Sequence, residues 1–237
     1  ATGNTVVLKP AETTSLTALL FAELCEQAGI PDGVVNIITG DGTTGSLLVN
    51  HKDINKIAFT GSTQVGKSIQ KSLAGRDVGL TLELGGKAAN IIYEDAAIDQ
   101  AVEGVVNGIF FNQGHVCCAG SRLLLQESIH DEFVAKLEKR MQTLRVGNPL
   151  DKNTDIGAIN SKEQLDKIEG LVNEGVSDGG KIFQTECELP GNGFWFKPTL
   201  FTDVQPSYSI AREEIFGPVL TTLTFRTPQE AIEIANN

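Results

Sequence analysis

The sequence is most informative about its fold at Lys56-Ile57-Ala58-Phe59-Thr60-Gly61-Ser62-Thr63-Gln64-Val65-Gly66-Lys67. The first half of this stretch has the β-branched and aromatic character of a strand, and a glycine-rich turn follows directly. Ile69 and Leu73 then continue with helical spacing. A glycine-rich turn between a strand and a helix is where backbone N–H groups and the helix dipole receive a phosphate group. The stretch therefore predicts a strand-turn-helix unit that can receive a phosphate group.

The residues before this unit show the same alternation of strands and helices. Residues 5–9 form a short apolar run typical of a buried parallel strand, residues 16–28 have helical spacing, and residues 34–38 form a second strand. Strands that alternate with helices favour a parallel sheet. The sequence therefore predicts an α/β fold whose first part is a partial, mostly parallel Rossmann-like sheet.

A P-loop is an alternative interpretation of residues 61–68, because they fit the pattern Gly-x-x-x-x-Gly-Lys-Ser. A P-loop works with an acidic strand that holds Mg²⁺, and the sequence contains no such strand nearby. Short matches of this kind arise by chance, so the P-loop interpretation has little support.

A second stretch carries two adjacent thiols: Phe110-Phe111-Asn112-Gln113-Gly114-His115-Val116-Cys117-Cys118-Ala119-Gly120-Ser121-Arg122. The small residues around these thiols let backbone N–H groups approach a sulfur and stabilise a thiolate. The alternative is that Cys117 and Cys118 are small buried hydrophobic residues, as most free cysteines are.

A carboxylate in a third stretch favours the catalytic interpretation. Leu82-Glu83-Leu84-Gly85-Gly86-Lys87 places Glu83 in an apolar run that ends in a Gly-Gly turn. Burial in this run would make the carboxylate a better proton acceptor, as a general base requires.

Together the last two stretches resemble the aldehyde dehydrogenase superfamily, whose motifs include Glu-Leu-Gly-Gly-Lys followed by Phe-x-Asn-x-Gly-Gln-x-Cys. The resemblance implies that Cys117 is the nucleophile and that Glu83 is the general base. The chain differs from the motif at His115, where the family usually has Gln. The family motif Phe-Thr-Gly-Ser-Thr-x-x-Gly also fits residues 59–66, and this segment lies over the dinucleotide diphosphate in the family.

The resemblance also predicts the cofactor. The family holds the adenosine ribose with a Lys-Pro-x-Glu segment, which Lys9-Pro10-Ala11-Glu12 matches. The Glu12 carboxylate can accept hydrogen bonds from both ribose hydroxyls and would repel a 2′-phosphate, so we expect NAD rather than NADP. The alternative is that Lys9 and Glu12 form a surface pair at a strand end. The full set of residues expected at the cofactor is Lys9, Glu12, Gly61, Ser62, Gly66, Leu84, Glu214 at the nicotinamide ribose and Phe216 near the nicotinamide ring.

The composition is that of a globular protein. The 237 residues, 41% of them hydrophobic, can form one large domain or two small ones. A net charge of -11 without Lys/Arg clusters argues against nucleic acid or an anionic membrane as a partner. The cysteines Cys25, Cys117, Cys118 and Cys187 lack the spacing of a zinc or disulfide framework, so we expect reduced thiols and no metal site. No secretory signal or membrane-spanning run is visible, which favours the cytoplasm.

The resemblance also implies a domain organisation. We expect a partial dinucleotide-binding domain at residues 1–82 and an α/β catalytic domain at residues 83–237. Further helices are expected at residues 99–111, 130–146 and 161–171, and an aromatic strand at residues 191–200. Family members extend beyond both ends of this chain, with an oxyanion-hole Asn upstream and a subunit-pairing strand downstream. We therefore expect a fragment whose catalytic domain is C-terminally incomplete, and homo-oligomers for full-length relatives.

The resemblance implies NAD-dependent oxidation of a small-molecule aldehyde to a carboxylic acid, through a thiohemiacetal and a thioester on Cys117. Glu83 would activate the water that releases the acid. One alternative is a thiol hydrolase or acyltransferase with His115 as its base, which would leave the cofactor motifs unexplained. Another is a catalytically silent module, because the oxyanion-hole segment is missing.

Overall fold

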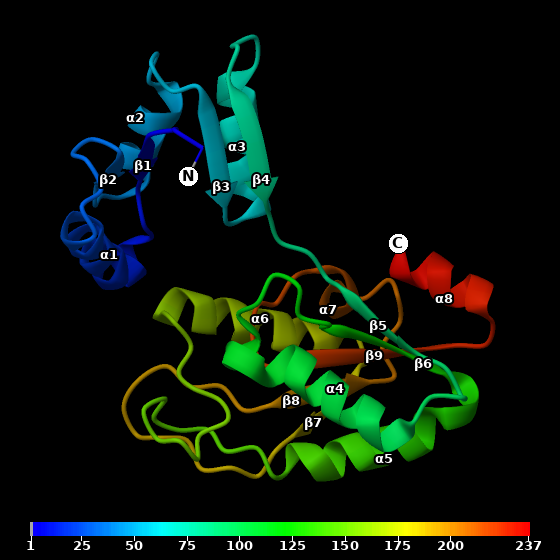
Figure 1. Cartoon of the computed structure of the whole chain (residues 1–237). Coiled ribbons are helices and arrows are strands. Elements are labelled where there is room, and N and C mark those ends of the chain that lie inside the picture. Colours follow the sequence, from blue (N-terminus) through cyan, green and yellow to red (C-terminus); the bar gives the residue numbers. More distant parts are fainter. Residues whose placement is uncertain (1) are drawn as a thin grey trace. The chain divides into compact units, whose positions relative to one another are not determined.

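The computed structural model describes residues 2–237 and divides into two compact units. The N-terminal unit ends at Leu84, and the C-terminal unit comprises Gly85–Asn237 (Figure 1). Each unit has its own sheets and its own hydrophobic clusters. Within residues 2–237, no helix combines the length and the apolar character needed to cross a membrane.

The N-terminal unit contains two parallel strand pairs. β1 pairs with β2, with Val6 opposite Val35, and β3 pairs with β4, with Lys56 opposite Gly79. A helix connects the strands of each pair, which is the predicted strand-helix-strand order. The elements are β1 Val6–Leu8, η1 Glu12–Thr14, α1 Ser15–Gln27, β2 Val35–Ile37, α2 Gly42–Asn50, β3 Lys56–Thr60, α3 Thr63–Leu73 and β4 Gly79–Glu83. The prediction of an α/β fold with parallel strands is confirmed.

The buried core of the N-terminal unit belongs to β3, β4 and the helices beside them. It consists of Val49, Ile69 and Leu73, with Ile57, Phe59, Val78 and Leu80 packed against them. β1 is different, because Val6, Val7 and Leu8 are 49%, 42% and 40% exposed. The predicted burial of the strand at residues 5–9 is therefore wrong, although its parallel pairing is right. Since β1 pairs with β2 alone, and none of the buried clusters among residues 2–237 includes its side chains, these side chains stay at the surface.

The C-terminal unit is built on a five-stranded sheet with the strand order β5-β6-β9-β8-β7. All neighbouring strands are parallel except β7 and β8, which are antiparallel. The strands are β5 Ala89–Ile92, β6 Arg122–Gln126, β7 Lys181–Gln184, β8 Thr199–Thr202 and β9 Val219–Phe225. The helices are α4 Ile98–Phe110, η2 Phe111–Gly114, η3 Glu127–Ile129, α5 His130–Met141, α6 Lys162–Ser177, α7 Ser209–Arg212 and α8 Pro228–Ala235.

Helices cover both faces of this sheet, because successive side chains of β6 belong to hydrophobic clusters of different helices. Leu123 and Leu125 belong to the cluster that α4 and α5 form with the sheet, whereas Leu124 belongs to the cluster of α8. Successive side chains of a strand point to opposite faces, so these two clusters lie on opposite sides (Figure 1). Complete burial on both faces explains why β6 reads as a continuous apolar run.

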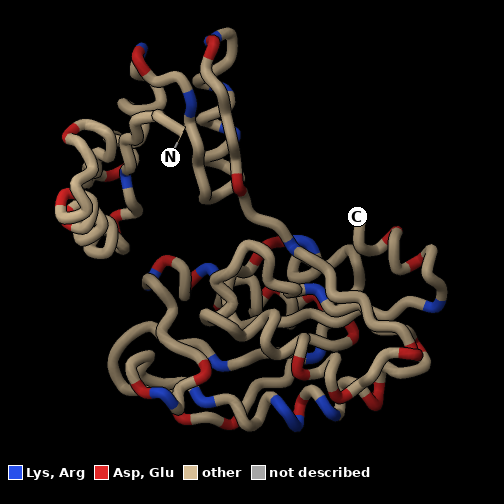
Figure 2. Tube along the Cα trace, viewed as in Figure 1, with Lys and Arg blue, Asp and Glu red and all other residues tan. Residues whose placement is uncertain are grey.

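Charged side chains of the C-terminal unit join α4 to α5 at the surface. Lys136 Nζ lies 2.8 Å from Asp99 Oδ1, and Arg140 Nε lies 2.7 Å from Glu103 Oε1. Figure 2 shows acidic and basic positions interspersed along the trace. Exposed pairs of this kind contribute little to stability, because water and salt screen them. The contact between the two helices therefore depends mainly on the buried apolar residues.

Three sequence predictions need correction in the C-terminal unit. The helix expected at residues 130–146 ends at Met141, because the chain turns at Gln142 and Leu144 N–H bonds to Met141 O. The strand expected at residues 191–200 is confined to Thr199–Thr202, because Gly193 has φ +111° and a proline precedes the strand. The helix predicted for residues 161–171 continues to Ser177.

Candidate active site

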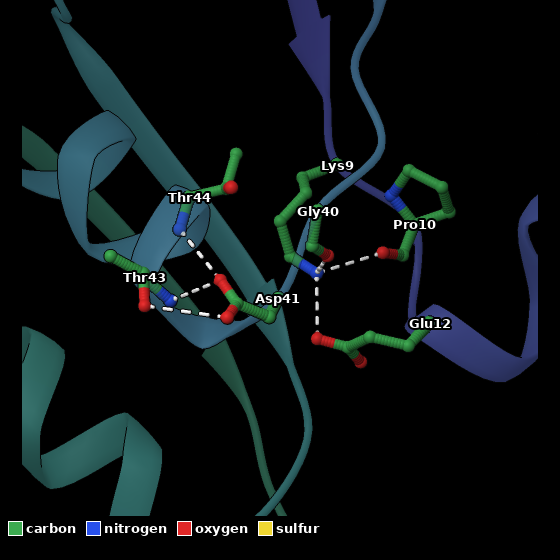
Figure 3. A network of polar contacts seen from close by, with 7 residues as sticks. All are labelled: Lys9, Pro10, Glu12, Gly40, Asp41, Thr43 and Thr44. Carbon is green, nitrogen blue, oxygen red and sulfur yellow. Dashed lines mark hydrogen bonds and ion pairs between the residues drawn. The ribbon is translucent and has the colours of Figure 1, made fainter.

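Lys9 organises a polar network at the carboxyl ends of β1 and β2 (Figure 3). Its Nζ donates to Pro10 O at 2.9 Å, to Gly40 O at 2.7 Å and to Glu12 Oε1 at 3.3 Å. The Lys9 side chain is 16% exposed, whereas that of Glu12 is 58% exposed. A backbone N–H and the Lys9 ammonium lower the pKa of Glu12. The network therefore holds an ionised carboxylate open to solvent at this sheet edge, where a ribose could bind.

Asp41 lies beside this network and was not among the predicted site residues. Its Oδ1 accepts hydrogen bonds from Thr43 N at 2.9 Å and Thr44 N at 3.3 Å, and so caps α2 (Figure 3). These backbone N–H groups, that of Thr44 first, lower the pKa of Asp41. The Gly-Asp-Gly order after a strand is a recognisable N-cap pattern, so the sequence contained a signal for this residue.

The predicted phosphate turn joins β3 to α3. Ser62 caps α3, because its Oγ accepts a hydrogen bond from Val65 N at 3.3 Å. The other first-turn N–H groups of a helix lack partners within the helix and are the donors that an anion meets. A Cβ on Gly66 would lie 2.5 Å from Leu84 Cδ2, so this position must be glycine for Leu84 to pack there. Similarly, a Cβ on Gly61 would lie 2.5 Å from the Phe59 ring.

Glu83 is the last residue of β4 and pairs with Thr60 of β3. The burial predicted for Glu83 is wrong, because the residue is exposed. Leu80 and Leu82 point to the inner face of β4, so the alternation of the strand directs Thr81 and Glu83 outward. Glu83 belongs to the N-terminal unit and Cys117 to the C-terminal unit, and their action as a pair stays a prediction.

The two thiols follow an unusual turn at the end of α4. Asn112, Gln113 and Gly114 have φ of 49°, 58° and 74°, which places three consecutive residues in the left-handed region. Such a conformation is costly for residues other than glycine and persists only where the surroundings hold it. Cys117 and Cys118 lie in the turn beyond, and both are exposed. The interpretation of these cysteines as buried hydrophobic residues is therefore wrong.

Side chains and close backbone contacts hold this turn. Gln113 Oε1 accepts a hydrogen bond from Gly157 N at 2.9 Å, and Asn112 Nδ2 donates to His115 O at 3.2 Å. A Cβ on Gly114 would overlap with Gly217 O. On the far side of the thiols, Asn90 Nδ2 donates to Gly120 O at 3.4 Å. The thiols are thus carried on a backbone that is fixed from both ends.

The residues Glu214 and Phe216 lie on a turn directly beside the thiol turn. Glu214 Oε1 accepts a hydrogen bond from Gly86 N at 3.2 Å, and Phe216 has φ 55°. Gln164 Nε2 of α6 donates to both Ile215 O and Phe216 O, at 2.9 and 3.0 Å. No local sequence signal identified Gln164, because it lies far along the chain from the turn it supports. The turn also places the ring of Phe216 parallel to that of His115.

Lys87 is a further residue whose environment the sequence did not reveal. Its Nζ is buried and has no hydrogen-bond partner among residues 2–237. Burial, and then the nearby Arg122, lower the pKa of Lys87 to about 7, while Glu214 and Glu213 act in the opposite direction. The Lys87 amine is therefore a titratable group near neutral pH beside the Glu214 turn.

The lowered pKa of Lys87 predicts a pH dependence of stability. Its pKa is 10.5 in an ordinary environment and about 7 in the folded chain, so between these values the unfolded state binds the proton and the folded state does not. Stability should therefore rise with pH from about 7 upward. Lys87→Met is expected to raise the free energy of unfolding near pH 6 by about 1–4 kcal/mol, and to flatten this rise. Urea unfolding of the parent chain and of Lys87→Met at several pH values measures this free energy.

The matched control for Lys87→Met is Lys139→Met, because Lys139 is an exposed lysine of α5. This control should leave the pH dependence of unfolding as it is in the parent chain. A Lys87→Met chain that is less stable than the parent at every pH would contradict the prediction.

Comparison with known proteins identifies the family. The model of the aldehyde dehydrogenase family matches residues 1–237. The chain belongs to the aldehyde dehydrogenase family. This confirms the family that the motifs around Glu83 and Cys117 predicted, and the α/β fold predicted with it.

Curated relatives from distant organisms match the whole chain. An aldehyde dehydrogenase of Emericella nidulans is 48% identical over 240 residues, which cover 100% of this chain and 48% of the relative. The human mitochondrial aldehyde dehydrogenase is 47% identical over 239 residues, covering 100% of this chain and 46% of the relative. This member of the aldehyde dehydrogenase family therefore spans about half the length of the curated relatives it matches.

Solved structures of the family agree with the fold. The NAD-dependent aldehyde dehydrogenase of Sinorhizobium meliloti is 43% identical with a TM-score of 0.95, over 98% of this chain and 46% of that one. A betaine aldehyde dehydrogenase of Staphylococcus aureus, solved in complex with NAD+, is 40% identical with a TM-score of 0.95, over 100% of this chain and 48% of that one. The arrangement of elements described above is therefore that of the aldehyde dehydrogenases.

Proposed function

We propose that this chain carries the nucleophile, the general base and much of the cofactor site of an NAD-dependent aldehyde dehydrogenase. The observation that supports this proposal most is the exposed Cys117, which closely follows a left-handed turn that packs against the turn of Glu214 and Phe216. A reactive thiol must be accessible and held in place, and both conditions are met here. The proposed substrate is a small-molecule aldehyde.

The described residues fit NAD. Glu12 presents an ionised, exposed carboxylate at the end of β1, and the first turn of α3 offers backbone N–H groups for the diphosphate. Leu84 packs on Gly66 of that helix. We assign Lys9, Glu12, Gly61, Ser62, Gly66 and Leu84 to the adenosine and diphosphate side, and Glu214 and Phe216 to the nicotinamide side. The cofactor, when bound, supplies the hydride acceptor of the reaction.

The proposed chemistry takes place on Cys117. Its thiolate attacks the aldehyde carbonyl carbon and forms a thiohemiacetal, and loss of hydride from that carbon leaves a thioester. Glu83 then takes a proton from a water molecule, whose oxygen attacks the thioester and displaces the thiolate. The products are a carboxylic acid, NADH and a proton, and Cys117 is ready for the next aldehyde.

Glu12→Gln tests the cofactor assignment. The neutral amide cannot accept two charge-assisted hydrogen bonds from the ribose, and it no longer repels a 2′-phosphate. We expect the Kd for NAD to rise about tenfold and the preference for NAD over NADP to shrink. Calorimetric titration with NAD and NADP measures both effects. Glu23→Gln, at an exposed position of α1, should bind like the parent chain, and the assignment fails if Glu12→Gln does so too.

Two further expectations remain proposals. Homo-oligomer formation is proposed for the full-length relatives. One relative is named a mitochondrial enzyme, so the family alone does not fix the compartment, and the cytoplasmic location stays a prediction.

A further inference from the structure

Two aromatic rings stack between the thiol turn and the neighbouring turn. The imidazole of His115 and the phenyl ring of Phe216 have centroids 5.3 Å apart and an interplanar angle of 6°. This is an offset parallel stack, one of the two favoured arrangements of aromatic pairs. Glutamine, which the family usually has at the position of His115, cannot form it.

Phe216 needs support from its surroundings. Its φ of 55° is costly for a residue with a Cβ. Gln164 Nε2 holds the backbone by donating to Phe216 O at 3.0 Å, but this bond does not orient the phenyl ring. The imidazole of His115 is stacked on that ring.

His115 is itself held on a rigid backbone. His115 N donates to Asn112 O at 2.9 Å, and Asn112 Nδ2 donates to His115 O at 3.2 Å. The preceding Gly114 is in close contact with Gly217, the residue after Phe216. The stack is therefore built on two turns whose backbones already touch, so movement of one ring is limited by the other.

The imidazole is suited to stacking because it is uncharged at neutral pH. Burial lowers the pKa of His115, and no charged group contributes to the shift. Its Nε2 is buried and has no hydrogen-bond partner among residues 2–237. A hydrogen bond to Nε2 thus does not account for the position of the ring, whereas the stack with Phe216 is a contact of its face.

We propose that His115 is a positioning residue, which holds the Phe216 ring in the orientation that receives the nicotinamide end of the cofactor. This inference rests on the proposed function, because that function places Phe216 at the nicotinamide. His115 thereby connects the cofactor side of the site to the turn that carries Cys117, two residues further along the chain. The role depends on the aromatic face of His115 and not on its nitrogen atoms.

Three variants of the full chain separate these features. His115→Phe keeps an aromatic face, His115→Leu removes it at similar volume, and His130→Leu is a control at a histidine on α5. Urea unfolding midpoints identify any variant that merely loses stability. Calorimetry gives the Kd for NAD, and steady-state kinetics give KM for NAD and kcat separately. NMR spectra of the phenylalanine rings, with Phe216 assigned through Phe216→Leu, report the ring directly.

We expect His115→Leu to raise the Kd and KM for NAD about 3- to 10-fold, with a smaller change in kcat. The Phe216 ring signals should move toward averaged positions in this variant. His115→Phe should restore both the affinity and the dispersed Phe216 signals, and His130→Leu should match the parent chain.

Two results would overturn the inference. Unchanged Phe216 signals in His115→Leu would show that the imidazole does not position the ring, and equal losses in His115→Phe and His115→Leu would assign the effect to the nitrogen atoms. A parent chain that does not bind NAD would refute the proposed function instead, while the NMR spectra still decide whether His115 positions Phe216.

Discussion

Cys117→Ala is expected to abolish NADH formation from aldehydes, with a loss of at least about 10⁴-fold relative to the parent chain. Without the thiolate, neither the thiohemiacetal nor the thioester can form, so the route to hydride transfer is removed. The substitution replaces an exposed side chain on a turn, and the urea unfolding midpoint should stay close to that of the parent. NADH absorbance with a panel of aldehydes measures the activity, and intact mass after alkylation counts the reactive thiols.

Cys118→Ala is the matched control, because Cys118 is the next residue and is exposed as well. It should retain most of the activity. NADH formation that survives in Cys117→Ala and disappears in Cys118→Ala would move the nucleophile to Cys118. Turnover without NAD that depends on Cys117 would favour the thiol hydrolase. A folded parent chain that forms no NADH, although Cys117 is alkylated faster than Cys118, would favour the silent module.

The fold could be predicted where a local pattern determines the structure. The strand at Lys56–Thr60 and the helix that follows it need no distant contact to be recognised, because β-branched residues, glycines and helical spacing lie within one short stretch. The strand predicted at residues 191–200 begins too early, because the observed strand is confined to Thr199–Thr202. Its aromatic neighbours suggested a longer strand, but Gly193 and the proline before Thr199 interrupt it.

Sequence motifs name the candidate site residues, whose roles stay predictions, but the motifs do not give their arrangement. Exposure of Cys117 depends on the left-handed turn before it, and Gln113 has no intrinsic preference for that conformation. A hydrogen bond to Gly157 and the contact of Gly114 with Gly217 hold the turn, and both partners are distant in sequence. The burial of Lys87 and the exposure of Glu83 likewise depend on packing that the local sequence does not encode.

Glu83→Gln is expected to separate the two halves of the proposed reaction. The amide has nearly the shape of the carboxylate but cannot accept a proton, so the attack of water on the thioester should slow by about 10²- to 10³-fold. Acylation does not need this base. We therefore expect one rapid burst of NADH, close to one equivalent per thiol, followed by a slow steady rate. Intact mass of the quenched chain should show the acyl group on Cys117.

The structure makes this variant a clean test, because Glu83 is exposed at the end of β4 and lies outside the buried core of its unit. Replacing it should leave the unfolding midpoint unchanged, so a loss of activity can be attributed to chemistry. Glu163→Gln, at an exposed position of α6, is the control and should show parent kinetics. A Glu83→Gln chain that forms NADH at the parent's steady rate, without a burst, would exclude Glu83 as the base. Hydroxylamine, which attacks thioesters without needing a base, should restore turnover if the stalled species is the acylated Cys117.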